Sequence, residues 1–187
     1  MESNKQKTAL LVMDMQMGIL SRYPDADKLA NIIAKGITHA RKNNIPVIYV
    51  VVGFRKGMPE ISENNKSFSA IKGMMAETDM NEWMRVLPAI APLENEVTVV
   101  KRRFSAFTGS DLQVVLSGMN INHIVLTGVA TSGVVLLTTR EAADKDYRIT
   151  ILSDCCADAD EEVHRVLTTK IFPRQAEVMT LEEWNKI

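Results

Sequence analysis

Two ionisable side chains stand where short apolar segments of the sequence end. Asp14 directly follows the apolar run ALLVM, residues 9–13. A carboxylate at the mouth of such a run is partly removed from water, which raises its pKa and suits it to general acid or base catalysis. The alternatives are that Asp14 caps the following helix or forms only a salt bridge.

Lys101 ends a second apolar segment, VTVV, and would pair with Asp14 if both segments end in one crevice. Such a pair would keep Asp14 ionised, or orient it while a proton moves. Because Arg102 and Arg103 follow directly, a solvated basic turn is the alternative interpretation of this lysine.

The segment GVATSG, residues 128–133, joins a β-rich run to a helical stretch. Backbone N–H groups at such a helix start favour negative charge and could form an oxyanion hole. The glycine spacing fits neither a dinucleotide-binding fingerprint nor a P-loop. A plain strand-to-helix turn, capped by Thr131 or Ser132, is the alternative.

The histidines and cysteines do not form a recognisable metal site. His39 and His123 have no partner at metal-ligand spacing, and His164 is best explained as part of a helix surface. Cys155 and Cys156 are adjacent, follow a β-rich run and are expected to be buried small apolar residues. We therefore predict neither a metal nor another cofactor.

Alternating apolar runs and helical stretches must position these side chains. The apolar runs predict six strands, at residues 9–13, 46–52, 97–100, 123–127, 148–152 and 176–179. Helices are expected at residues 25–43, 110–117, 131–144, 160–170 and 180–184, and a long, functionally interesting loop at about 53–69.

This alternation predicts an α/β fold with a doubly wound parallel sheet and helices on both faces. Ligands of such sheets bind outside the carboxyl ends of the strands, which is where Asp14 and Lys101 are expected.

Length and charge limit the function classes. The 187 residues are expected to form a single domain, residues 1–187, and 22 basic against 23 acidic residues give a net charge of −1. This balance gives no electrostatic reason to bind nucleic acid. The longest apolar runs are too short to span a membrane, the first eight residues are polar, and the cysteine usage suits a reduced compartment, so we expect a cytoplasmic protein.

Four sequence blocks, in this order, resemble the isochorismatase-like hydrolases, also called cysteine hydrolases. They are ALLVMDMQ, VVKRRFSAFTGSDL, IVLTGVATSGVVLLTTREAADKDY and ITILSDCCAD. The resemblance extends over residues 9–179, nearly the whole chain. It implies a Rossmann-like six-stranded parallel sheet in the order 3-2-1-4-5-6 and a homo-oligomer.

The resemblance also implies roles for individual residues. Asp14 and Lys101 match the family's catalytic aspartate and lysine. Phe107 would line the pocket, Gln16 would lie near its mouth, and a cis peptide bond is expected between Val129 and Ala130. The turn containing these two residues and Thr131, Gly133 and Val134 would shape the substrate pocket.

The sequence departs from the family pattern at two places. The nucleophilic cysteine of most members falls on Val134, which has no nucleophilic atom, so thiolate attack is not available there. The segment VVVGFRKG, residues 50–57, lacks the aspartate and histidine with which the amidase branch binds zinc.

Three functions remain open. The first is a hydrolase that uses Asp14 and Lys101 on a small-molecule substrate without a thiol, as isochorismatases do with a vinyl ether. The second is a hydrolase with Ser132 or Thr131 as nucleophile. The third is a non-catalytic relative that binds a small ligand or partner. In the predicted long loop, Arg55 and Lys56 could meet a substrate carboxylate.

Overall fold

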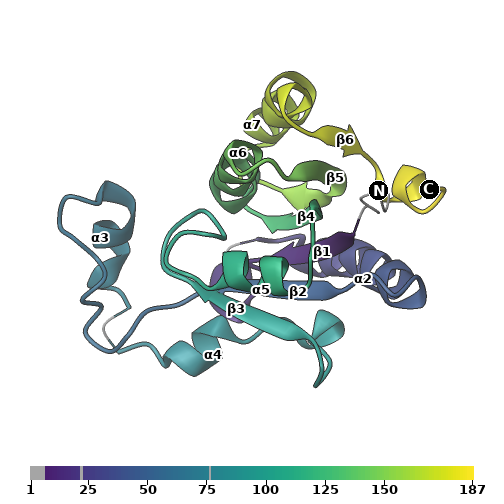
Figure 1. Cartoon of the computed structure of the whole chain (residues 1–187). Coiled ribbons are helices and arrows are strands. Elements are labelled where there is room, and N and C mark those ends of the chain that lie inside the picture. The colour runs from purple at the N-terminus through teal and green to yellow at the C-terminus, as the bar shows by residue number, and fades with distance from the viewer. Residues whose placement is uncertain (1–6, 22, 76) are drawn as a thin grey trace.

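Six parallel strands form one sheet in the order β3-β2-β1-β4-β5-β6, which confirms the predicted topology (Figure 1). The computed structural model describes residues 7–21, 23–75 and 77–187. The strands are β1 (Thr8–Met13), β2 (Val47–Val52), β3 (Val97–Lys101), β4 (His123–Val129), β5 (Arg148–Ala157) and β6 (Glu177–Met179). Each predicted strand is present, and β5 continues five residues beyond its predicted end.

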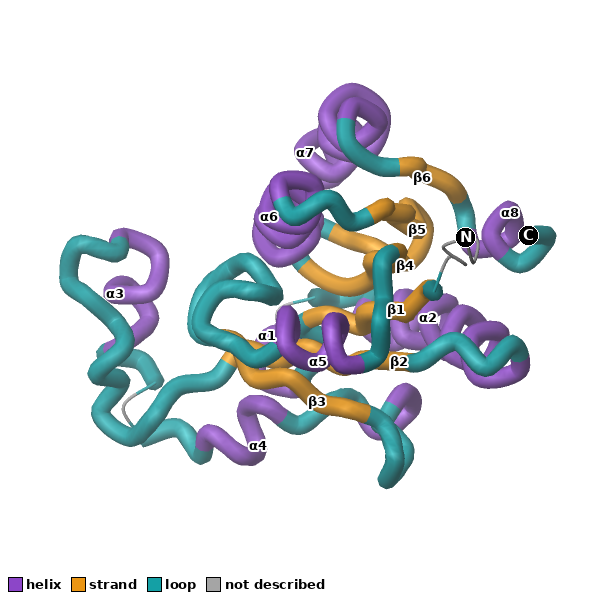
Figure 2. Tube along the Cα trace, viewed as in Figure 1, coloured by secondary structure: helices purple, strands orange, loops and turns teal. Residues whose placement is uncertain are grey.

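Helices cover both faces of this sheet (Figure 2). They are α1 (Met17–Leu20), α2 (Ala26–Lys42), α3 (Lys66–Lys72), α4 (Met80–Met84), α5 (Leu112–Gly118), α6 (Leu136–Asp144), α7 (Glu161–Val166) and α8 (Leu181–Trp184). Shorter helical turns are η1 (Pro88–Ile90), η2 (Thr131–Val135), η3 (Leu167–Ile171) and η4 (Phe172–Arg174). Within the described ranges, no helix is long and apolar enough to cross a membrane.

Side chains of each central strand alternate between two cores. In β1, Leu11 and Met13 pack with residues of α5 and α6, whereas Leu10 and Val12 pack with α2 and α8. Because both faces are covered, the strands are apolar at nearly every position, which is the signal that the sequence carries.

Several predicted helix boundaries were wrong. The chain after β4 enters a π-helical turn, η2, before α6, and Ala130 precedes it without a side-chain cap, so neither Thr131 nor Ser132 caps this helix. The predicted loop 53–69 ends at Asn65, whose side chain accepts a hydrogen bond from the Phe68 N–H and thereby caps α3. Helices α1 and α4 were not expected.

The segment between β2 and β3 projects from the sheet as an arm that carries α3 (Figure 1). It has a small apolar core of its own, formed by Val52, Phe54, Met58, Ile61, Phe68 and Met75. The arm is therefore a packed structure that can supply a wall to a neighbouring site.

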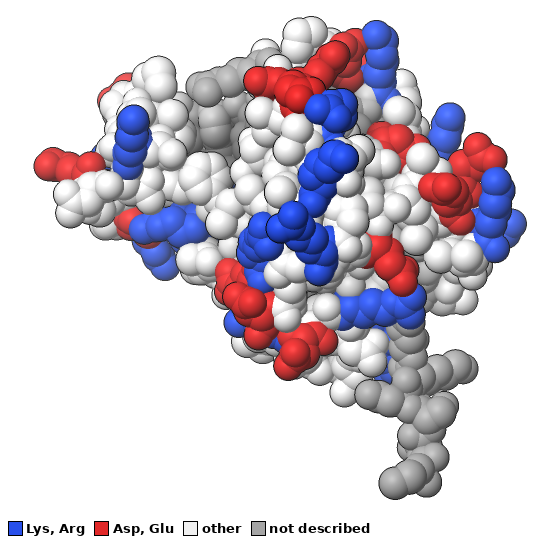
Figure 3. Space-filling model, turned by 90° about the horizontal axis from the view of Figure 1, so that it is seen from above, with Lys and Arg blue, Asp and Glu red and all other residues white. Residues whose placement is uncertain are grey.

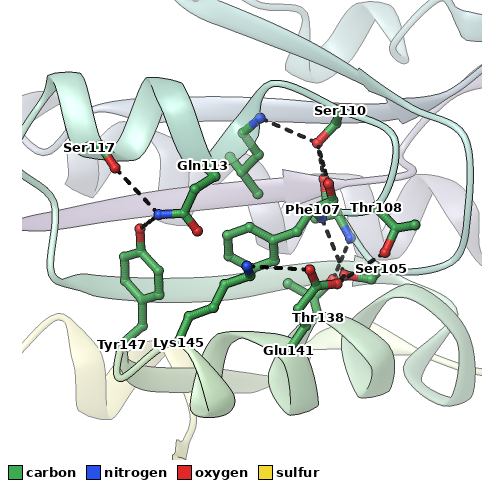
Figure 4. Close-up of polar contacts among 12 residues, drawn as sticks. Ser105, Phe107, Thr108, Ser110, Gln113, Ser117, Thr138, Glu141, Lys145 and Tyr147 are labelled. Atoms are coloured by element: carbon green, nitrogen blue, oxygen red, sulfur yellow. Dashed lines mark hydrogen bonds and ion pairs between the residues drawn. The ribbon is translucent and has the colours of Figure 1, made fainter.

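The loop after β3 is attached to α6 by a group of hydrogen bonds (Figure 4). The Glu141 carboxylate accepts hydrogen bonds from the Ser105 hydroxyl at 2.6 Å and the Thr108 hydroxyl at 3.0 Å. The Ala106 N–H donates to the Thr138 hydroxyl at 2.9 Å. These contacts fix the chain that follows Lys101.

On the molecular face in Figure 3, acidic and basic side chains are interspersed. This mixed surface agrees with the near-zero net charge of the sequence.

Gly128 allows β4 to approach β1 closely at the edge where the candidate site lies. Its φ is +122°, and a Cβ atom there would overlap the carbonyl oxygen of Met13, the residue paired with Gly128 across the sheet. Glycine alone combines this backbone conformation with this approach.

We predict that Gly128→Ala lowers the free energy of unfolding by about 3 kcal/mol or more, because the added methyl group is strained and displaces β1. Gly118→Ala is the control: it lies in α5 with no atom within 4 Å of a Cβ, and should change stability by no more than about 1 kcal/mol. Urea unfolding at one protein concentration measures both. Equal stabilities for the two variants would contradict the explanation.

Candidate functional site

A buried ion pair joins Asp14 and Lys101 at the carboxyl edge of the sheet. The Lys101 Nζ lies 2.9 Å from Asp14 Oδ2, and the two side chains are only 1% and 7% exposed. The structure thus brings together the two residues predicted to be catalytic. Asp14 does not cap a helix, because Gln16 precedes α1, and Lys101 is not solvated. The salt bridge that was the other alternative for Asp14 is present.

The sheet order explains how the two side chains meet. Strand β2 lies between β1 and β3, and strands are spaced by about 4.8 Å, so the two residues belong to strands about 10 Å apart. The long Lys101 side chain bridges this distance at the end of β2. Asp14 adopts a left-handed backbone conformation, with φ of +56°, as the chain leaves β1.

Burial and pairing with Lys101 shift the pKa of Asp14 in opposite directions. Removal from water raises the pKa of the Asp14 carboxyl above its ordinary value of 3.8, and the Lys101 ammonium offsets part of this rise. Lys101 also donates a hydrogen bond to the Arg103 carbonyl at 2.9 Å. Asp14 Oδ1 is buried without a hydrogen-bond partner among the described residues.

The pair lies in the wall of a cavity of about 240 Å³. The rest of the wall is mostly apolar and aromatic, and its residues come from α1, β2, β4, the arm and the segments beside them. They are Gly18, Ile19, Tyr23, Val52, Phe54, Phe68, Ile71, Trp83, Phe104, Val129, Ala130, Gly133 and Val134. Tyr23 stays neutral because burial, Asp158 and Asp14 raise the pKa of its hydroxyl.

Four residues of the turn after β4 line the cavity as predicted: Val129, Ala130, Gly133 and Val134. The peptide bond between Val129 and Ala130 is cis, as the resemblance implied.

Thr131 was expected to line the pocket and does not. Its side chain is fully buried behind the turn, where its hydroxyl lies 2.8 Å from His164 Nδ1. A histidine partner that sequence reasoning missed is therefore present, but the hydroxyl does not reach the cavity. Ser132 is exposed and also lies outside the cavity wall.

Two backbone N–H groups of the turn after β4 are engaged within the protein. The Ser132 N–H donates to the Asp158 carboxylate at 2.7 Å, and the Gly133 N–H donates to the Ala130 carbonyl at 3.1 Å. These two donors are therefore not free to hold an oxyanion.

Gln16 supports the wall instead of lying at its mouth. Its amide exchanges two hydrogen bonds with the Val52 backbone, at 2.8 and 3.0 Å, and donates a third to the Trp83 carbonyl at 3.1 Å. The side chain is fully buried. It therefore ties the end of β2 to α4, two of the elements around the cavity.

Phe104, not Phe107, is the cavity aromatic of the loop after β3. Phe107 is buried in the core, where its ring centroid lies 5.9 Å from that of Tyr147. Phe104, three residues earlier, faces the cavity and packs on Phe68 at 4.8 Å. Phe107 points inward because the contacts of Ser105 and Ala106 with α6 hold the chain just before it.

The loop cations named from the sequence do not enter the cavity. Arg55 forms an ion pair with Glu60 at 2.7 Å, and Lys56 is exposed. Neither belongs to the cavity wall.

Both cysteines of the chain lie outside the cavity wall. Cys155 and Cys156 are buried, as expected, and burial raises the pKa of both thiols, that of Cys156 to about 12. In the part of the chain that is described, no group of three or more His, Cys, Asp or Glu side chains is arranged to hold a metal ion.

The sequence did not identify the aromatic residues that enclose the site. Phe54, Phe68 and Trp83 come from the arm and α4, and Tyr23 precedes α2. The sequence carries one signal for these aromatic residues: Phe54 and Phe68 stand in the otherwise polar segment 53–69, which is predicted to be a functional loop.

A larger hollow of about 1010 Å³ lies between the start of α2 and the chain after β5. It shares Tyr23 with the cavity, but most of its charged side chains are exposed, including Asp25, Lys28 and Glu161. Exposed charges are screened by water, so this hollow does not offer the perturbed acid that the Asp14 cavity does.

Comparison with known proteins identifies the family of this chain. Residues 8–183 match the isochorismatase domain. The isochorismatase family protein YecD of Escherichia coli O157:H7 is 30% identical over 98% of this chain and 97% of its own. The phenazine biosynthesis protein PhzD of Pseudomonas fluorescens is 30% identical over 95% of this chain and 84% of its own.

The fold agrees as well. An isochorismatase family protein from Burkholderia thailandensis superposes with a TM-score of 0.83 at 27% identity, over 96% of this chain and 94% of that one. The chain therefore belongs to the isochorismatase family, whose members are generally hydrolases.

Proposed function

We propose that this protein hydrolyses a small molecule by acid–base catalysis with Asp14 and Lys101, without a cysteine nucleophile. The observation that carries the proposal is the buried 2.9 Å ion pair in the wall of a cavity whose remaining surface is apolar and aromatic. A desolvated carboxyl group with a raised pKa, adjacent to a small cavity, is suited to proton transfer.

Acid-assisted cleavage of an enol ether illustrates the chemistry. Protonated Asp14 donates its proton to the double-bond carbon remote from the ether oxygen, which leaves an oxocarbenium ion. Water adds to the cationic carbon and loses a proton, and the resulting hemiketal breaks its C–O bond to give a ketone and an alcohol. The proton released by water returns to the Asp14 carboxylate, so the carboxyl group is protonated again at the end of the reaction.

The surrounding residues favour the charged intermediate. After donating its proton, Asp14 is a carboxylate that the Lys101 ammonium stabilises at 2.9 Å. The faces of Trp83, Phe68 and Phe104 in the cavity wall carry partial negative charge, which attracts a cation.

The position of Val134 in the cavity wall supports a mechanism without a thiol, since its side chain offers no nucleophilic atom there. The two cysteines lie elsewhere and are protonated near neutral pH. Water is therefore the proposed nucleophile.

Asp14→Asn is expected to lower kcat/KM by about 10²- to 10⁴-fold, because the amide cannot supply the proton. Asp154→Asn, which alters an exposed aspartate of β5 outside the cavity, should retain full activity. Turnover of a panel of small enol ethers, esters and amides measures both, with circular dichroism to verify folding. Full turnover by Asp14→Asn would refute the mechanism, and ligand binding without Asp14-dependent turnover would favour the non-catalytic alternative.

The pH dependence follows from the sign of the Asp14 shift. The acid is active when protonated, so kcat/KM should fall as pH rises through the pKa of Asp14, with a midpoint above 3.8. Lys101→Met removes the ammonium that lowers this pKa, and the midpoint should move to higher pH. Lys145→Met, outside the cavity, should leave the midpoint in place. A midpoint that moves downward in Lys101→Met contradicts the assignment.

Treatment with iodoacetamide at neutral pH should leave turnover unchanged. Both thiols are buried, burial raises their pKa values, and neither contacts the cavity. Mass spectrometry of the intact protein establishes how many thiols react. Inactivation in step with alkylation of one cysteine would indicate thiol catalysis instead.

A further inference from the structure

The turn of residues 129–134 is held by two side chains from outside the cavity. Four of its residues line the cavity, whereas Thr131 and Ser132 do not. The Thr131 hydroxyl lies 2.8 Å from His164 Nδ1, and the Ser132 N–H donates to Asp158 Oδ2 at 2.7 Å. Asp158 and His164 belong to the wall of the larger hollow. The turn therefore lies between the cavity and two residues that line the hollow.

The start of η2 depends on partners outside the turn. Ala130 precedes η2 without a side-chain cap, and its carbonyl accepts hydrogen bonds from the Gly133 and Val135 N–H groups at 3.1 and 3.3 Å. The acceptor for the Ser132 N–H is Asp158, which is 26 residues away in the sequence and acts as the missing cap. The backbone of this part of the cavity wall therefore relies on the chain after β5.

Thr131 also needs a partner, because its side chain is fully buried. A buried hydroxyl without a hydrogen bond is costly, and among the described residues His164 is the one to which this hydroxyl is bonded. Burial lowers the pKa of the His164 imidazole below its ordinary value of 6.5, although Asp158 offsets part of this change. At pH 7.5 the ring is therefore neutral, and its Nδ1 can accept from or donate to the hydroxyl.

The position of His164 is itself fixed by its helix. The Asp160 side chain caps α7 by accepting hydrogen bonds from the Glu162 and Val163 N–H groups. The His164 N–H donates to the Asp160 carbonyl at 3.0 Å, and the Thr168 hydroxyl donates to the His164 carbonyl at 2.8 Å. Because the backbone of His164 is held on both sides, its ring can fix the position of the turn.

We propose that His164 is a positioning residue of the candidate site. Through its hydrogen bond with Thr131, and with Asp158 as a second anchor, it holds the turn of residues 129–134 where four of its members line the cavity. His164 does not belong to the cavity wall, so it acts on a bound molecule only through the turn. The proposal rests on the proposed function in taking this cavity as the reaction site, but the anchoring itself does not require turnover.

Amide hydrogen exchange, followed by NMR at pH 7.5, tests the anchoring without a substrate. His164→Leu removes the ring nitrogen, whereas His164→Asn keeps a polar atom near the place of Nδ1. We expect the Gly133 and Val135 amides to exchange about tenfold faster or more in His164→Leu, and within about threefold of the unaltered protein in His164→Asn. The Leu10 amide, which donates to the Pro46 carbonyl, reports overall stability. Equal acceleration at Leu10, or slow exchange that asparagine does not restore, overturns the proposal.

Variants of Thr131 test whether the two side chains act as a pair. Thr131→Val removes the hydroxyl and keeps the shape, so it should accelerate the same amides as His164→Leu. The double variant should exchange within about threefold of either single variant, because both changes remove one hydrogen bond. Exchange beyond this limit would show that the residues act independently and overturn the pair. Thr131→Val also provides the test if His164→Leu does not fold.

Turnover tests whether the anchoring serves the site, with any substrate of the panel that shows Asp14-dependent hydrolysis. His164→Leu should lower kcat by about fivefold or more, and His164→Asn should restore it to within about twofold, because the position of the cavity wall controls that of the substrate. An unchanged kcat in His164→Leu overturns the role at the site. Exchange is measured without turnover, so inactivity of the unaltered protein toward every substrate would refute the proposed function and leave the exchange result intact.

Discussion

The site depends on the cost of removing two charges from water. Each ion of a buried pair loses several kcal/mol of hydration, and the attraction between them repays this only when the geometry is good. Asp14 and Lys101 meet at 2.9 Å because parallel strands end at one edge of the sheet and a lysine can cross the end of β2. A pair of this kind adds little stability, so its chemistry is the better explanation for its presence.

The strand-end residues could be predicted from the sequence because one physical rule governs them. Strands that are covered on both faces are apolar at nearly every position of the sequence. The first polar residue after such an apolar run therefore lies at the carboxyl edge of the sheet. Asp14 and Lys101 were identified in this way, and residues 128–133 by the same reasoning. The strand order, in contrast, came from the family resemblance, since alternation of strands and helices is compatible with several orders.

The enclosing residues could not be predicted, because their positions depend on contacts distant in sequence. Whether Phe104 or Phe107 faces the cavity is decided by the contacts of Ser105 and Ala106 with α6, about 35 residues away. From the sequence, Gln16 could equally lie at the mouth of the cavity. Its hydrogen bonds with Val52, which place it behind the cavity wall, are visible only in the structure. Trp83 reaches the site only because the arm folds back from β2.

Two features of the cavity and its surroundings bear together on the proposed mechanism. Valine at position 134 and arginines directed at the arm leave a cavity with one paired acid, one paired base and aromatic walls. Val134 offers no thiolate to attack a carbonyl, whereas the mechanism proposed above needs only an acid and π-faces that stabilise a cation. Valine at position 134 therefore removes thiolate attack, and the Asp14–Lys101 pair supplies the acid for the acid-assisted hydrolysis proposed in its place.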